Sequence, residues 1–404
     1  MSVSLLGCAL FYTGPFIRRE VSAMKVSQRN WSPENGWSSS SSLETDSQAQ
    51  LVLAFAGRSI LGENSHYDEL KAFYPNAHIL SCSTAGEIED THITDETIIA
   101  TAVFFKDTAL RVLQLHIDDV GDSHMAGEKI AEQLNSDDLS HVFIISDGQH
   151  TNGTKLAKGM SSRLSRKVHI TGGLAGNGVL FKCTLVGLDA PPEEGNIAAV
   201  GFYGEKLKVG FGSVGGWDSF GPERLITKSR DNILYELDYK SALTLYKDYL
   251  GDKANDLPGS GLLFPLCIRT EKSSKPLVRT ILSVNEEDQS MSFAGDMPQG
   301  AYARLMKASS DSLIEGARKA AVASLEGSQN IRPDLAILIS CVGRRLVMRQ
   351  RVEEEIEAIR EVLGNNTVIT GFYSYGELAP FNPGLACEFH NQTMTITTFG
   401  EYDE

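Results

Sequence analysis

One pattern occurs three times along this chain and constrains its fold more than any other feature. Each copy contains a short continuous apolar segment, a helical segment, a second apolar segment, a loop of small residues and further strand-like segments. The opening apolar segments are Leu51–Ala56, Val142–Ile145 and Leu335–Ile339, and the loops are residues 81–87, 171–177 and 370–377. Continuous apolar runs joined through helices are typical of buried parallel strands. The pattern therefore predicts three related strand–helix–strand units.

The segments around these strands predict an α/β protein with mixed sheets. We expect helices at 65–73, 154–165 and 351–363, second strands at 77–80, 168–170 and 367–369, and added strands at 97–105, 110–117, 180–188, 197–203 and 388–399. Polar and apolar residues alternate from Asn391 to Phe399, which is typical of a half-exposed antiparallel strand. The predicted fold class is α/β, with repeated strand–helix–strand units, added antiparallel strands and mixed sheets flanked by helices.

Length and pattern predict two domains and a leader. A chain of 404 residues favours more than one domain, and we place the boundary near Gly251, which gives domains at 50–250 and 251–404. Between the second and third copies we expect a helix at 241–250, a strand-rich block at 262–293 and a helix at 311–325. Residues 1–49 are predicted to form a flexible leader because Ser27–Ser47 is very polar. The start is expected to be over-long, with Met24 as an alternative initiator.

Composition excludes several classes of partner. The formal net charge is −15, and an acidic surface repels both nucleic acid and anionic lipid. No run approaches the roughly 20 apolar residues that a membrane-spanning helix needs, so we expect no membrane insertion. The six cysteines are scattered without a CxxC pair, which disfavours zinc and covalently attached haem and favours a reducing, cytoplasmic location.

The small-residue loops are the main candidate for a ligand-binding site. In open α/β sheets ligands bind at the carboxyl ends of strands, where all three loops are predicted to lie. Their glycines allow close approach, and their hydroxyl, carboxylate and phenol groups can bind a small molecule. The candidate residues are Ser83, Thr84, Gly86, Glu87, Gly172, Gly173, Tyr373, Tyr375, Gly376 and Glu377. The alternative is that small residues only let a strand turn beneath its neighbour.

Motifs of common enzymes are absent or incomplete. Gly210–Gly215 matches GxGxxG, but the residues that follow do not predict the helix that a dinucleotide site requires. The sequence has no GxxxxGK[ST], GxSxG or HExxH motif, so we expect no enzymatic activity. Cys341 precedes Arg344, and the pair is a candidate ligand-binding element. Two alternatives stay open: a buried structural cysteine, and a nucleophile with His390 as base.

A cluster of arginines and two histidines are further candidates for contact with a ligand. Arg344, Arg345, Arg349 and Arg351 form a basic cluster that can bind a carboxylate or pair with the glutamates that follow. Among the nine histidines, His150 follows a strand end and His390 lies near the closing strand. These two are the candidate metal ligands, because a non-covalently bound haem needs one imidazole in an apolar pocket.

Several segments together resemble the FIST family of sensory proteins. They are Ile79–Glu87, the segment from Gly216 to Thr227, Leu237–Leu250, Ser340–Arg344, Gly371–Glu377 and His390–Thr393, which adds Asn391 to the candidate ligand-binding residues. The resemblance covers about residues 50–400 and implies an N-terminal FIST domain at 50–250 and a C-terminal FIST domain at 251–404. It also implies a small-molecule sensor in signal transduction.

Stand-alone bacterial members that are similar to this chain include haem-binding nitric oxide sensors that regulate a partner histidine kinase. The resemblance therefore implies haem b as cofactor and a histidine kinase or other signalling protein as partner. The alternatives are a sensor of amino acids or another metabolite, an enzyme that uses Cys341, and a scaffold.

Overall fold

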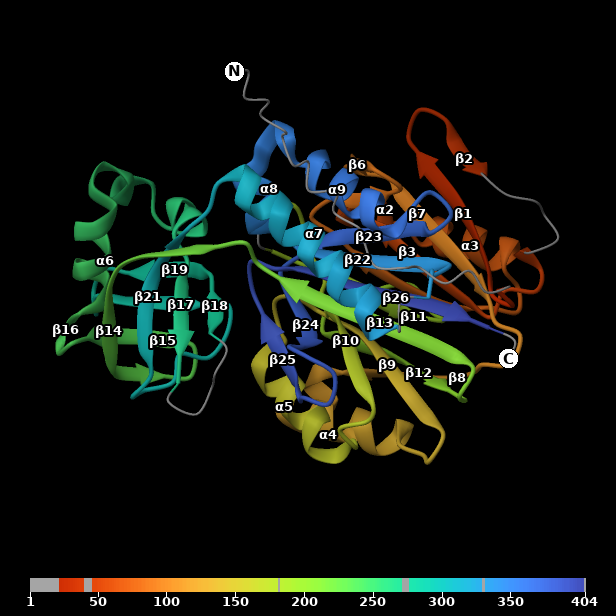
Figure 1. Ribbon diagram of the computed structural model, residues 1–404, viewed down its shortest axis with the longest axis horizontal. Helices are drawn as coiled ribbons and strands as arrows, with labels where there is room; N and C mark the ends of the chain where they lie inside the picture. The colour runs from red at the N-terminus through yellow and green to blue at the C-terminus, as the bar shows by residue number, and fades with distance from the viewer. Residues whose placement is uncertain (1–21, 40–45, 181, 271–275, 329–330, 403–404) are drawn as a thin grey trace, which may run out of the picture.

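The computed structural model describes residues 22–39, 46–180, 182–270, 276–328 and 331–402 (Figure 1). They form two parts. The body comprises the described residues up to 217 and from 308 onward, and the inserted unit comprises those of 218–307. Figure 1 shows the inserted unit, coloured green to cyan, beside one end of the body.

The three sheets of the body share one plan. Each contains a parallel pair: β3 (Leu51–Ala56) with β4 (His78–Ser83), β9 (Leu139–Ser146) with β10 (His169–Leu174), and β22 (Leu335–Cys341) with β23 (Val368–Ser374). The antiparallel neighbours are β7 (Ile98–Phe104), β12 (Asn196–Tyr203) and β26 (Met394–Glu401). The next strands outward are β1 (Lys25–Ser32), β8 (Ala109–His116) and β13 (Leu207–Val214). The three predicted units and the mixed α/β fold are therefore confirmed.

The repeats exchange strands in a cycle. After each small-residue loop the chain leaves its own sheet: β5 (Glu87–Glu89) pairs with β23, β24 (Gly376–Pro380) pairs with β10, and β11 (Val186–Leu188) pairs with β4. The first repeat thus completes the sheet of the third, the third that of the second, and the second that of the first. The edges are extended by β2 (Gly36–Ser39), β6 (His92–Thr94) and β25 (Cys387–His390).

Helices connect the strands within each repeat. The described helices of the body are α2 (Arg58–Leu61), α3 (Asn64–Phe73), α4 (Ser123–Leu134), α5 (Gly153–Arg163), α7 (Ser310–Gly327), α8 (Val342–Met348) and α9 (Glu353–Leu363). Polar side chains cap the first turns of α4 and α5: Asp122 accepts from Met125 N, and Asn152 accepts from Lys155 N. Helix α7 packs on β13, β26 and α9, so it covers one face of the third sheet.

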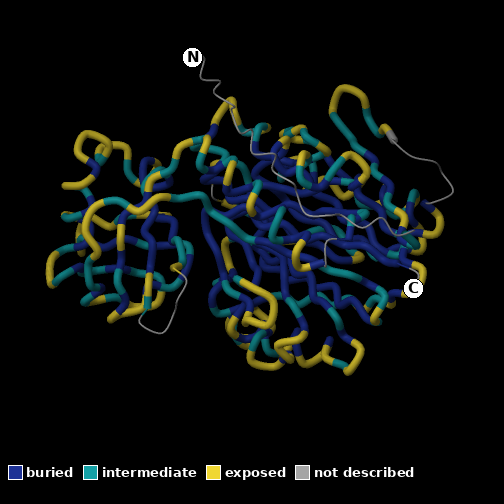
Figure 2. Tube along the Cα trace, in the orientation of Figure 1, coloured by how far each residue is buried: buried dark blue, intermediate teal, exposed yellow. Residues whose placement is uncertain are grey.

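The core of the body lies between the sheets. One cluster contains Phe55 from the first repeat, Phe143 from the second and Phe372 from the third, all buried. The rings of Phe55 and Phe372 lie 4.8 Å apart between centroids. Figure 2 shows the strands of the body as a continuous buried interior. Because this core draws on all three repeats, the body folds as one unit.

The inserted unit is a β-rich element with its own core. Its strands are β14 (Asp218–Arg230), β15 (Ile233–Leu237), β16 (Lys240–Ser241), β17 (Leu266–Arg269), β18 (Leu277–Arg279), β19 (Ile281–Asn285), β20 (Ser290–Phe293) and β21 (Tyr302–Lys307). Helix α6 (Ala242–Leu250) packs on this sheet through Leu243 and Tyr246. Two 3-10 segments, Gly251–Asp256 and Gly259–Leu263, follow the helix. Gly251, where we placed the boundary between the two domains, lies inside the inserted unit. In space, the chain therefore divides into the body and the inserted unit, and not at Gly251.

The expected flexible leader is wrong for residues 25–39. Strand β1 pairs with β7, and the buried side chain of Arg29 forms an ion pair with Asp46 at 2.5 Å. The segment is polar, but ladder hydrogen bonds pair its backbone with β7, and Asp46 pairs with the buried guanidinium of Arg29. Residues 1–21 and 40–45 of the expected leader lie outside the described residues, and Met24 is buried before β1.

The expectation of a half-exposed closing strand is also wrong. All residues of β26 are buried, since the strand lies between β22 and β13 and α7 packs on it. Thr395 in this strand shares a 2.8 Å hydrogen bond with Ser213. Alternation along a strand marks exposure only where one face meets water, and here both faces are covered.

Candidate ligand-binding site

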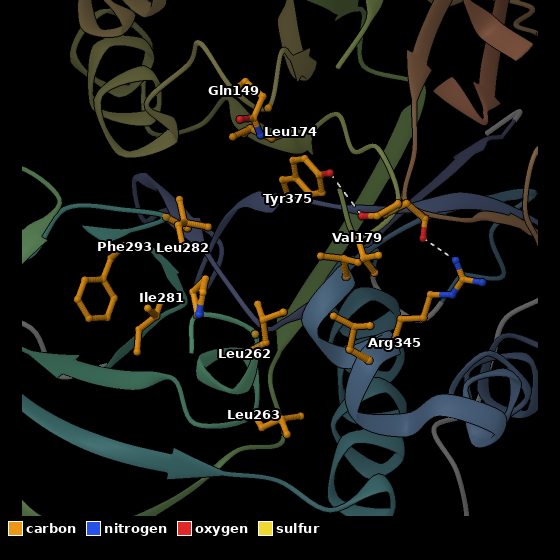
Figure 3. A pocket seen from close by; sticks show the side chains of 18 of the residues that line it. Gln149, Leu174, Val179, Leu262, Leu263, Ile281, Leu282, Phe293, Arg345 and Tyr375 are labelled. Atoms are coloured by element: carbon orange, nitrogen blue, oxygen red, sulfur yellow. Dashed lines mark hydrogen bonds between the residues drawn. The ribbon is translucent and has the colours of Figure 1, made fainter. Parts of the chain in front are cut away.

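A pocket of about 1350 Å³ lies between the body and the inserted unit (Figure 3). This is larger than the roughly 300–1,000 Å³ of most small-molecule sites. Its lining residues are Ala85, Gly148–Asn152, Leu174, Gly178, Val179, Val342, Arg345, Leu346, Arg349 and Tyr375 from the body, and Asn232, Lys253, Asp256, Pro258–Ser260, Leu262, Leu263, Ile281, Leu282, Phe293 and Ala294 from the inserted unit.

All three small-residue loops reach this pocket. Ala85, Leu174 and Tyr375 represent the first, second and third loop, each at or just beyond the carboxyl end of a parallel strand. Backbone hydrogen bonds join the loops in a ring: Ala85 N–H donates to Tyr373 O at 2.8 Å, Tyr375 N–H to Leu174 O at 3.2 Å, and Gly176 N–H to Ser83 O at 2.9 Å. The loops therefore form one rigid floor, as expected for strand ends in an α/β fold.

Apolar side chains line both sides of the pocket. Figure 3 shows Val179 and Tyr375 of the body across the cavity from Leu262 and Leu282 of the inserted unit. The hydroxyl of Tyr375 donates to Asn177 O at 3.0 Å, so its ring is held in place. These apolar side chains suit a ligand that has apolar surface, while polar side chains such as Gln149, Asn152 and Asn232 also line the pocket and can bind its polar groups.

His150 is a half-exposed polar residue of the pocket whose ring is held by a buried carboxylate. Its ring Nδ1 lies 3.0 Å from Oδ1 of the buried Asp147, which also accepts from the backbone N–H groups of Gln149 and His150. The other carboxylate oxygen accepts from Thr184 Oγ1 at 2.8 Å and Gly195 N at 3.2 Å. A carboxylate only accepts, so in the neutral imidazole Nδ1 carries the proton and Nε2 has the free lone pair. This is the arrangement of a metal-ligating or hydrogen-bond-accepting histidine.

Three cationic residues also line the pocket: Arg345, Arg349 and Lys253. Arg345 is committed elsewhere, since it donates to both carboxylate oxygens of Asp95 at 2.7 and 2.6 Å and to Ala85 O. The bonds to Asp95 raise the pKa of Arg345. Gly86 lies against the same guanidinium: a Cβ there would sit 2.5 Å from Arg345 Nη1, and φ is +129°. Arg345 thus fixes the first loop, while Arg349 and Lys253 can meet an acidic ligand group.

Glu87 and Glu377 are buried acceptors that hold the loops. Thr84 Oγ1 donates to Glu87, and Thr97 donates to it through N at 3.1 Å and Oγ1 at 2.9 Å. Burial raises the pKa of Glu87 to about 7 and that of Glu377 to about 8. Both lie behind the floor, and neither lines the pocket. Sequence analysis did not connect Glu87 with Thr97 or Glu377 with Thr393, because these threonines follow 10 and 16 residues later along the chain.

Several other candidate residues have structural positions. Arg344 is buried and pairs with Glu355 at 2.7 Å, and Tyr373 Oη donates to Glu355 at 2.6 Å. Gly172 and Gly173 lie within β10, and Gly376 packs against Phe389. Ser83 Oγ accepts from Leu185 N at 2.8 Å. These residues shape the elements behind the pocket, so the predicted list contains one direct lining residue from the loops, Tyr375, together with His150.

Cys341, His390 and Asn391 also lie behind the pocket lining. Cys341 ends β22 as a buried residue, and burial raises the pKa of its thiol, which is the opposite of what a nucleophile needs. His390 is buried in β25, where Nε2 lies 2.9 Å from Ala379 O. Asn391 is buried, and both polar atoms of its side chain lack a hydrogen-bond partner. The structure therefore separates His390 from the pocket that contains His150.

Sequence reasoning missed the second wall of the pocket. Residues Lys253–Leu263 and Ile281–Leu282 are far from the loops in sequence, and their position depends on how the inserted unit folds back. The signal present is weak: Pro258–Leu263 is a glycine-rich apolar segment without a regular period. Within the described part of the chain, no group of three or more His, Cys, Asp or Glu side chains could hold a metal ion.

The fold defines an α/β protein built from three repeats that exchange strands, with a pocket beside the inserted unit. The model of the FIST N domain matches residues 50–240, and that of the FIST C domain matches residues 242–380. The chain therefore belongs to the family of proteins with FIST domains, which are sensory and signalling domains. Comparison with curated protein sequences gives no significant match. No helix in the described ranges is both long and apolar enough to cross a bilayer.

Proposed function

We propose that this protein is a non-enzymatic sensor that binds haem b in the pocket and responds to nitric oxide. The observation that carries the proposal is the position of His150, whose Nδ1 is held by the buried Asp147 while its Nε2 stays available at an apolar pocket. The sensory role of FIST domains agrees with it.

The residues of the pocket fit a haem group in three respects. His150 would supply the axial nitrogen, the apolar walls would contact the porphyrin, and Arg349 and Lys253 would pair with its acidic groups. Bound haem supplies an iron centre that accepts a diatomic gas. The chain would orient the imidazole through Asp147, and Leu262, Leu282 and Val179 would contact the porphyrin.

A sensor must also change conformation when its ligand binds, so that a partner protein can distinguish the two forms. Ligand binding shifts the equilibrium between two conformations only if it favours one of them. Here the pocket walls belong to two parts of the molecule, so a ligand that touches both favours their closed arrangement. We propose a histidine kinase as the protein that reads this difference, with another signalling protein as the alternative partner.

Absorption spectroscopy of the purified protein tests the proposal. Haemin titration is expected to give a Soret band that shifts when nitric oxide is added to the reduced protein. His150→Ala should lose or shift the band, and imidazole should restore it, whereas the matched variant His390→Ala should keep it. Absence of the band in the wild-type protein would contradict haem binding and would favour a sensor of amino acids or another metabolite.

A further inference from the structure

The pocket is formed by two parts that share few covalent links. The inserted unit leaves the body after β13 and returns before α7, so two short connections hold it to the body. It has its own sheet and its own core. A unit of this kind can change its orientation without disturbing its interior, as in hinged domain closure.

Apolar side chains at the pocket remain partly open to solvent. Val179 of the body is 59% exposed and Leu282 of the inserted unit is 44% exposed, and Figure 3 shows them on opposite sides of the cavity. Removing apolar surface from water is favourable in proportion to the area that is covered. A ligand between the walls therefore favours an arrangement in which both side chains are covered.

One acidic residue of the inserted unit connects it to the pocket segment of the body. Asp296 accepts from Asn152 Nδ2 at 3.2 Å through Oδ1 and from Lys158 Nζ at 3.3 Å through Oδ2, and its N–H donates to Thr154 Oγ1 at 3.4 Å. We refer to these three contacts as the Asp296 bridge. Asn152 lines the pocket two residues after His150 and also accepts from the first turn of α5.

Two further contacts stiffen the bridge. The buried Arg279 donates from Nε to Asp296 O at 3.3 Å and from Nη1 to Phe389 O of the body at 3.0 Å. Lys155 Nζ lies 3.4 Å from Asp231 Oδ1 of the inserted unit. The contacts of Asp296 and Asp231 thus lie where α5 begins, directly after the His150 turn, while Gln392 Nε2 of the body donates to Leu262 O of the inserted unit at 3.2 Å on another side of the pocket.

We propose that the Asp296 bridge couples occupation of the pocket to the orientation of the inserted unit. This inference rests on the proposed function, since it requires a ligand in the pocket. A ligand that fixes the turn from Asp147 to Asn152 holds Asn152 against Asp296 and favours the closed arrangement. The inserted unit is then the part of the sensor whose position changes with the ligand.

Distance measurements between spin labels test the coupling in the full chain. Labels at Met125→Cys on α4 and Tyr239→Cys on the inserted unit use side chains that are 56% and 82% exposed. Cys8 and the half-exposed Cys183 are replaced by Ser, because the other cysteines are buried. The bridge variant is Asp296→Ala. Its matched control is Glu223→Ala, which removes an ion pair with Arg269 inside the inserted unit.

We expect Asp296→Ala to broaden the distance distribution without ligand, while Glu223→Ala leaves it unchanged. Haemin should narrow the wild-type distribution, and Asp296→Ala should bind haemin roughly three- to tenfold more weakly. Lys158→Ala, at a side chain that is 60% exposed, should reproduce part of both effects if Asp296→Ala fails to fold.

The possible outcomes separate this inference from the proposed function. If haemin gives no Soret band while Asp296→Ala still broadens the distribution, haem binding is wrong, and the Asp296 bridge still fixes the orientation of the inserted unit. The coupling is wrong if the bridge variants match Glu223→Ala in both measurements, or if haemin binds and leaves the wild-type distribution unchanged.

Discussion

Glu87 and Glu377 occupy the same place in the first and third repeats, and each receives hydrogen bonds in the same pattern. One oxygen accepts from a hydroxyl three residues earlier, Thr84 or Ser374, and the other accepts from the N–H and Oγ1 of the threonine before the next strand. In the second repeat Asn177 holds this place. Two of the three loops are thus fixed by a buried carboxyl group.

The first prediction concerns pH. Burial raises the pKa of Glu377 to about 8, above its ordinary value of 4.5, so the folded state binds the proton more tightly than the unfolded state. Stability should therefore be highest below about pH 4.5 for this group and fall by about 1.4 kcal/mol per pH unit up to about pH 8. Urea unfolding at several pH values should show a flatter profile for Glu377→Gln than for the wild type. Parallel profiles would contradict this assignment.

The second prediction concerns the buried ion pair. Arg344 and Glu355 are both buried, and Glu355 also accepts from Tyr373 and Ser340. Arg344→Ala leaves a buried carboxylate without its cation, so we expect a loss of about 3–5 kcal/mol in unfolding free energy. Removing the exposed pair through Arg318→Ala, whose partner is Glu361, should cost less than about 1 kcal/mol. Denaturant titration compares the two, and equal losses would be inconsistent with this reading.

The third prediction concerns the residue that positions His150. Asp147→Asn places an NH2 donor where His150 Nδ1, Thr184 Oγ1 and Gly195 N all donate, so at least one of these hydrogen bonds is lost and the imidazole is held less firmly. We expect the affinity for haemin to fall by about 10–100-fold. Titration followed at the Soret band measures this, with circular dichroism to verify folding. A folded variant with unchanged affinity would show that His150 does not need Asp147.

The fourth prediction concerns Cys341. Its thiol is buried and its pKa is raised by burial, so it should not react in the native state. Titration with a disulfide reagent at pH 8 should count the same number of reactive thiols in the wild type and in Cys341→Ala. Cys341→Ala should also bind haemin normally. One reactive thiol fewer in the variant would return Cys341 to consideration as a nucleophile.

The sequence predicted the units of this fold better than their arrangement. Local apolar runs such as Leu51–Ala56 and Leu335–Ile339 fix strands and their parallel partners. The sheets in which β5, β11 and β24 pair depend on contacts between repeats, and no local sequence pattern predicts such contacts. The polar composition of β1 predicts a flexible leader. The contacts that order the strand are made by Asp46, which pairs with Arg29, and by β7, and both lie later in the chain.

Some residues of the candidate site could be predicted from the sequence, and others could not. His150 could be found because it follows a strand end at the edge where ligands bind in α/β sheets. Arg344 and Tyr373 were chosen for their chemistry, and the structure uses that chemistry to satisfy Glu355. Leu262 and Leu282 could not be found, since an apolar residue is ordinary until its position beside a cavity is known.

The cyclic exchange of strands bears on the biosynthesis of the chain. A ribosome delivers β10 long before β24, yet β24 is the strand that covers the edge of β10. Nascent chains therefore carry an open edge until translation nears its end, and such edges promote aggregation. A nonsense mutation just before β24 would leave most residues present and still deprive the second repeat of its last partner.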